Sequence, residues 1–285
     1  MNIILVRHGK AKARIKRQGD PSGSRHHNPI LIMAKYMDEI TLAERAFVKD
    51  QTDIENVHQI RVKLRQIRSL LSFMKPLLNQ EEYWKYKAVL QGVSQRFSRL
   101  RQLDVLYEGW SEIIENSRGM IDKNSALSTA VSIERKQESL SIKEYISEGL
   151  MADELREAFT WIRALTLNME EYVSFADNRA ASWSKKAKKM SGKIDFNSIK
   201  ELHSLRVRYK KLRYVTDSLK SDKKNKLKKI QDALGSVCDS YLNISLLEEI
   251  KEKYQLPGLQ YEMGLLTGYQ LWEKEKSMKY LKTVL

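Results

Sequence analysis

Two histidines, and the arginines and lysines that follow them, are the residues of this sequence best placed to do chemistry. His58 is followed by Arg61, Arg65 and Arg68. At about 100° per residue these four side chains fall within about 80° of arc, so they form one basic row on a helix face. Guanidinium groups are planar and bind phosphate oxygens two at a time. The row therefore predicts a phosphate-bearing or similar polyanion as the ligand.

The same pattern occurs a second time in the other half of the chain. Residues 57–75 (VHQIRVKLRQIRSLLSFMK) and 202–220 (LHSLRVRYKKLRYVTDSLK) align with identical His, Arg, Val, Arg and final Lys. The first basic row is His58, Arg61, Arg65 and Arg68. The second basic row is His203, Arg206, Lys210 and Arg213. The chain has five histidines, and two of them share one repeat position, so we infer an internal duplication.

Each row lies beside an apolar stripe that faces a core. The stripe beside the first row is Ile60, Leu64, Ile67 and Leu71, and that beside the second is Leu205, Tyr209, Leu212 and Thr216. Like charges three or four residues apart on a helix repel by a few tenths of a kcal/mol per pair. A row without acidic residues is therefore best explained by an external polyanion. A solvated face, or a buried structural network of His and Arg, remains the alternative.

The composition points to the same class of partner. The chain has 285 residues, with 51 Lys or Arg against 36 Asp or Glu, and a net charge of +15. Such an excess favours nucleic acid, an anionic membrane surface or a phosphate polymer. The one cysteine, Cys238, excludes an internal disulfide framework, so we expect a reducing, cytoplasmic location. We expect no membrane span and no secretory signal.

The pattern of helix breakers predicts an all-α fold. No proline occurs between Pro76 and Pro257, and only the opening Met1–Val6 reads as a short strand. We predict eight helices in two sets of four. The second begins near Asp53 or Ile54 and passes Pro76, where it is kinked or ended. The others cover residues 30–50, 80–117, 124–147, 151–190, 197–219, 222–254 and 259–283. The predicted parts are an N-terminal segment (1–29), a first four-helix bundle (30–148) and a second (149–285).

Four segments in order resemble the CHAD domain, the conserved histidine α-helical domain. They are HQIRVKLRQIRSL (58–70), SRLRQLDVL (98–106), HSLRVRYKKLRY (203–214) and LKKIQDALGSVCD (227–239). The resemblance spans about residues 30–285. It implies two tandem four-helix bundles related by a pseudo-twofold axis, with a basic cavity between them. It also implies binding of inorganic polyphosphate and association with polyphosphate granules.

The resemblance assigns a set of binding residues by motif position. They are His58, Arg61, Arg65, Arg68, Arg101, His203, Arg206, Lys210, Lys211, Arg213 and Lys228. Gln66 stands where the motif often has a basic residue, and Gln102 where it often has an acidic one. Neither change removes the first basic row.

Other functions are weighed against binding. Nucleic-acid binding is the first alternative, although no zinc-finger spacing or RNP-like sequence occurs. A phosphatase or polyphosphate hydrolase accessory is the second, although we find no P-loop and no HExxH. We therefore expect no catalytic residue, cofactor or metal. The opening MNIILVRHGKA resembles the RHG motif of the histidine phosphatase superfamily, but the likeness ends there, so we do not assign His8 a catalytic role.

Overall fold

The computed structural model describes residues 27–218 and 224–285, and within those ranges the chain forms ten α-helices and no strand. The helices are α1 (Pro29–Lys49), α2 (Ile54–Met74), α3 (Gln80–Arg96), α4 (Ser98–Asn116), α5 (Ala126–Ser147), α6 (Leu150–Ala164), α7 (Met169–Ser191), α8 (Ile199–Ser218), α9 (Lys224–Lys253) and α10 (Leu259–Val284). The all-α prediction is confirmed. The strand predicted at Met1–Val6 lies outside the described residues.

The helix predicted over residues 80–117 is wrong, because the chain breaks at Phe97 into α3 and α4. Phe97 is fully buried in the core formed by α1–α3 and α6, whereas Leu103 and Trp110 on α4 are buried in a different core. Leu100, in the first turn of α4, still belongs to the first core, so the chain passes from one core to the other close to this break. The sequence has no glycine or proline there to mark it.

The helix predicted over residues 151–190 is also wrong, because residues 165–168 separate α6 from α7. Leu165 is extended, and the Asn168 side chain accepts hydrogen bonds from the backbone N–H groups of Glu170 and Glu171. Asparagine is a favoured N-cap, so this start of a helix had a signal in the sequence. At Pro76 the chain behaves as expected: α2 ends at Met74 and a 3-10 turn, Lys75–Leu77, follows.

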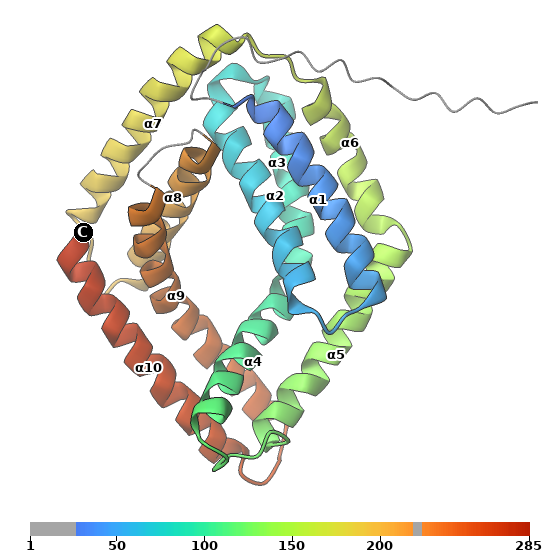
Figure 1. Cartoon of the computed structure of the whole chain (residues 1–285), viewed down its shortest axis with the longest axis vertical. Helices are drawn as coiled ribbons and strands as arrows, with labels where there is room; N and C mark the ends of the chain where they lie inside the picture. The colour runs from blue at the N-terminus through green and yellow to red at the C-terminus, as the bar shows by residue number, and fades with distance from the viewer. Residues whose placement is uncertain (1–26, 219–223) are drawn as a thin grey trace, which may run out of the picture.

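The helices are arranged as a four-sided frame (Figure 1). Helices α5, α6, α7 and α10 run along its four outer sides, and α2, α4, α8 and α9 lie inside it. Helix α2 contacts α8, and α4 contacts α9. The two helices that carry the basic rows are therefore neighbours in the interior of the frame.

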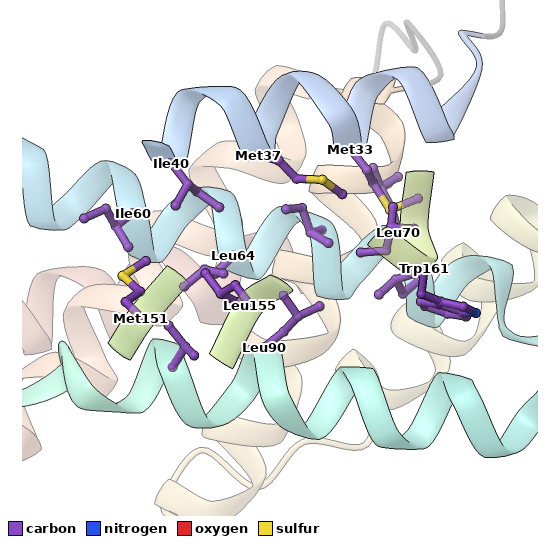
Figure 2. Packing of buried hydrophobic residues seen from close by; sticks show 14 of the residues in the cluster. Met33, Met37, Ile40, Ile60, Leu64, Leu70, Leu90, Met151, Leu155 and Trp161 are labelled. Atoms are coloured by element: carbon purple, nitrogen blue, oxygen red, sulfur yellow. The ribbon is translucent and has the colours of Figure 1, made fainter. Parts of the chain in front are cut away.

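Three hydrophobic cores hold this frame together. The largest joins α1, α2, α3 and α6, and Figure 2 shows Met33, Ile60, Leu90 and Leu155 among its side chains. The second joins α4, α5, α9 and α10, and the third joins α7–α10. Helix α6 packs with the first bundle's helices, although its residues fall after the predicted boundary at 148–149. The division of the cores therefore does not follow that boundary.

Candidate anion-binding cavity

Helices α2 and α8 turn their apolar stripes into cores and their basic rows toward a shared cavity. Ile60, Leu64 and Ile67 on α2, and Leu205 on α8, are completely buried. The cavity has a volume of about 650 Å³ and is lined from α2, α3, α4, α8 and α9. The predicted residues that line it are His58, Arg61, Arg65, Arg68, Arg101, His203, Arg206, Lys210, Lys211 and Arg213. Lys228 is exposed on α9 and is not part of this lining.

Two arginines of the first basic row, Arg61 and Arg68, are held by neutral acceptors. Arg61 Nη1 donates to the Ser94 carbonyl oxygen (2.7 Å) and to Ser98 Oγ (2.8 Å), on either side of the break between α3 and α4. Arg68 Nη2 donates to Gln91 Oε1 on α3 (3.0 Å). These contacts fix the side chains without neutralising them.

Burial and mutual repulsion disfavour the charged forms in this row. Burial first, and then the charge of Arg65, lower the pKa of Arg61 to about 10. The same two causes lower the pKa of Arg68. Both groups stay charged at neutral pH, so the first row holds positive charge that no cavity carboxylate offsets.

The second basic row carries its own carboxylate. Arg206 Nη2 donates to both oxygens of Asp239, at 2.8 and 2.9 Å. Lys210 lies one turn further along α8. Burial, followed by the charges of Arg65 and Arg206, lowers its pKa to about 7, and Asp239 only partly opposes this.

Several buried donors point to a ligand with many acceptor oxygens. The Nε atoms of Arg61, Arg68, Arg206 and Arg213 are buried and have no hydrogen-bond partner among the described residues. A buried donor without a partner costs about 1–3 kcal/mol. All four arginines line the same cavity. Phosphate oxygens, which accept hydrogen bonds readily, would satisfy these donors.

The two histidines differ, although they share one repeat position. His58 is half-buried, and burial, followed by the charge of Arg101, lowers its pKa. It is therefore mostly neutral at pH 7 and can donate one hydrogen bond. His203 is exposed at the edge of the second row.

The comparisons place this geometry in a family. The family model of the CHAD domain matches residues 31–248. The chain belongs to the CHAD domain family. Its fold is similar to that in a crystal structure of the CHAD domain from the plant Ricinus communis, with 16% identity, a TM-score of 0.72 and 92% of each chain covered. It is also similar to PptA from Streptomyces chartreusis, with 12% identity, a TM-score of 0.61, and 90% of this chain and 97% of that chain covered. The search of curated proteins found no significant match.

The CHAD motifs lie on the helices that surround the cavity. The two histidine motifs form α2 and α8, and the segments 98–106 and 227–239 lie on α4 and α9. The likeness to these two structures is a likeness of fold. The RHG segment with His8 lies outside both the described residues and the region matched by the CHAD model.

Three charged residues that line the cavity were not predicted from the sequence. Lys87 on α3 lines it, and so do Asp232 and Asp239 on α9. Lys87 and Gln91 are four residues apart and therefore share one helix face. That spacing was the sequence signal for a polar face of α3 directed at the cavity. In all, nine Lys or Arg and two Asp side chains line the cavity.

The described residues contain no group of three or more His, Cys, Asp or Glu side chains placed to hold a metal ion. Within the same ranges, none of the helices combines the length and the apolar character that crossing a membrane requires.

Proposed function

We propose that this CHAD domain binds inorganic polyphosphate in the cavity between its two basic rows, and that it acts by binding alone. The observation that supports this most strongly is the convergence of nine cationic side chains, from four helices, around one cavity. The family to which the chain belongs implies the same ligand.

The chemistry of polyphosphate fits the cavity in two ways. Its charges repeat at short, regular intervals, so a single chain can neutralise several cations at once. It would also relieve the repulsion from Arg65 that, after burial, lowers the pKa values of Arg61 and Arg68. Each phosphate also offers oxygens to the buried Nε donors. A single chain that binds one row is held close to the other, so the second contact forms at a high effective concentration and raises the affinity.

Nucleic acid is the competing ligand. Single-strand binders stack successive bases on aromatic side chains. Tyr214 is the aromatic residue among those that line the cavity, and the Arg213 guanidinium lies over its ring at 4.9 Å. That contact covers one face of the ring, which favours an unbranched inorganic chain over stacked bases.

We test this function with a charge reversal and a matched control. R65E changes the charge in the cavity by two units, whereas K279E makes the same change at an exposed position on α10. Isothermal titration with long-chain polyphosphate should show a loss of at least about tenfold for R65E and about twofold or less for K279E. Equal losses would contradict a cavity site.

Two further assays separate the alternatives. An oligonucleotide of equal total charge should compete poorly with polyphosphate, and efficient competition would favour nucleic acid. Incubation with polyphosphate and Mg²⁺ or Mn²⁺ should release no orthophosphate, and release would show a hydrolase. We also propose association with polyphosphate granules, which fluorescence microscopy of the R65E variant should show to be reduced.

A further inference from the structure

Arg61 and Arg206 occupy the same position in the two repeats but have different partners. Arg61 donates to a backbone carbonyl and a serine hydroxyl, so its full charge remains available to a ligand. Arg206 donates to both oxygens of the Asp239 carboxylate. The duplicated rows are therefore chemically unequal, although their sequences match.

The surroundings extend this difference to whole walls of the cavity. The wall formed by α2, α3 and α4 contributes five Lys or Arg side chains and no carboxylate to the lining, although one of the five, Arg101, pairs with Glu108 outside the lining at 3.2 Å. The wall formed by α8 and α9 contributes four, together with Asp232 and Asp239. The pKa of Lys210 is near 7, so this second wall is weaker still at neutral pH.

We propose that the wall formed by α2–α4 is the primary anchor for a phosphate chain, and that Asp239 is an internal counter-anion that limits how tightly the second wall holds it. This rests on the proposed function. Asp239 is thereby an affinity-determining residue rather than a direct contact of the ligand.

The second wall holds the phosphate chain less tightly because a phosphate must displace Asp239 from Arg206 before it can bind there. A carboxylate on a neighbouring helix competes with phosphate at high effective concentration, because it never diffuses away from Arg206. The Arg206 side chain is 13% exposed and that of Asp239 is 37% exposed, so solvent screens the pair only in part. A long chain that is already bound to the first wall can displace Asp239 from Arg206. A short anion that reaches only the first wall gains little affinity from the second.

The first test compares two carboxylates of the same wall. D239N removes the negative charge that pairs with Arg206, and D232N removes one from the same helix without that pair. For a chain of about 100 phosphates, D239N should tighten binding about threefold to tenfold and D232N about twofold or less. The gain for D239N should be smaller with pyrophosphate than with the long chain.

Two outcomes would overturn the proposal. Weaker binding by D239N would show that Asp239 positions Arg206 for the ligand. Equal gains from D239N and D232N would show only a general field effect. If the unaltered protein binds no phosphate chain, the proposed function itself fails, so the two failures are distinguishable.

The second test compares the two equivalent arginines. R61Q and R206Q each remove one positive charge at the same repeat position. R61Q should cost at least about threefold more affinity for the long chain than R206Q, because Asp239 already offsets the charge of Arg206. Thermal unfolding of both variants checks the fold. If R61Q unfolds, the variants R65Q and K210Q provide the same comparison at the repeat position one turn further along. This comparison is made at pH 6, where Lys210 is charged. Equal losses of affinity in the two variants would contradict the proposal that the walls bind unequally.

Discussion

The ammonium group of Lys210 is surrounded mostly by groups that disfavour its charge. Arg65 approaches from α2, and Arg206 lies one turn earlier on α8. Asp239 and Cys238 on α9 favour the charged form more weakly, and with burial the pKa of Lys210 falls to about 7. A bound polyanion supplies the missing negative charge and raises that pKa, so binding takes up a proton whenever the pH exceeds about 7.

Polyphosphate affinity should therefore fall as the pH rises. Below pH 7 Lys210 is already charged in the free protein, and above it the proton must be acquired on binding. Between pH 6.5 and 8.5 the association constant for a long chain should fall about tenfold. Titration calorimetry in two buffers with different ionisation heats measures the protons taken up. K210R, which stays charged, should lose most of this dependence, and an unchanged profile would exclude Lys210 as its source.

The basic rows were predictable because helical spacing alone puts their side chains on one face. Ten of the eleven predicted residues line the cavity, although their role in binding stays a prediction. Lys228 does not, because its position on α9 faces solvent. The partners of the rows were not predictable: the ion pair of Arg206 with Asp239 depends on how α8 packs against α9.

At the scale of helices, a buried ion pair fixes α4 to α5. Asp104 is completely buried, and Arg135 Nε donates to its Oδ1 at 2.6 Å. Burial is the main cause that raises the pKa of Asp104, and Arg135 opposes it. Removal of the arginine would leave a carboxylate buried without its partner, which is strongly unfavourable.

The variant R135M should therefore lower the free energy of unfolding by about 3 kcal/mol. The pair of Arg156 with Asp153 is exposed, so R156A should change it by about 0.5 kcal/mol or less. Urea denaturation followed by circular dichroism measures both. The double variant D104L/R135M should recover part of the loss, since it buries no charge. A loss in R135M no larger than in R156A would show that the pair contributes little.

Helix ends divide into those with a local signal and those set by packing. The helix breaks at Pro76 and at the pair Pro257–Gly258 had a signal in the sequence, because proline disrupts a helix anywhere beyond its first turn. Asn168 had a capping signal that was overlooked. Phe97 had none, because the need to bury it in one core and Trp110 in another arises only once the chain is folded.

At the scale of the whole molecule, duplication predicted two halves, but the cores cross between them. Helix α6 completes the first core, and α9 contributes to both of the others. The frame in Figure 1 brings α2 and α8 together in its interior. The sequence could predict that two basic rows exist, and the family resemblance that they share a cavity. The unequal charge of its walls required the structure.

A cavity lined by so many cations should make binding steeply dependent on salt. Each phosphate that the protein neutralises releases condensed counterions, with a slope of log K against log salt of about −0.7 per phosphate for a single-stranded polyanion. With nine cationic side chains lining the cavity, we expect a total slope of about −6 for a long chain. R65Q should reduce its magnitude by about 0.7, whereas K279Q on the outer surface should leave it nearly unchanged. Titrations at four salt concentrations measure these slopes. A slope near zero, or an equal change in both variants, would contradict charge pairing inside the cavity.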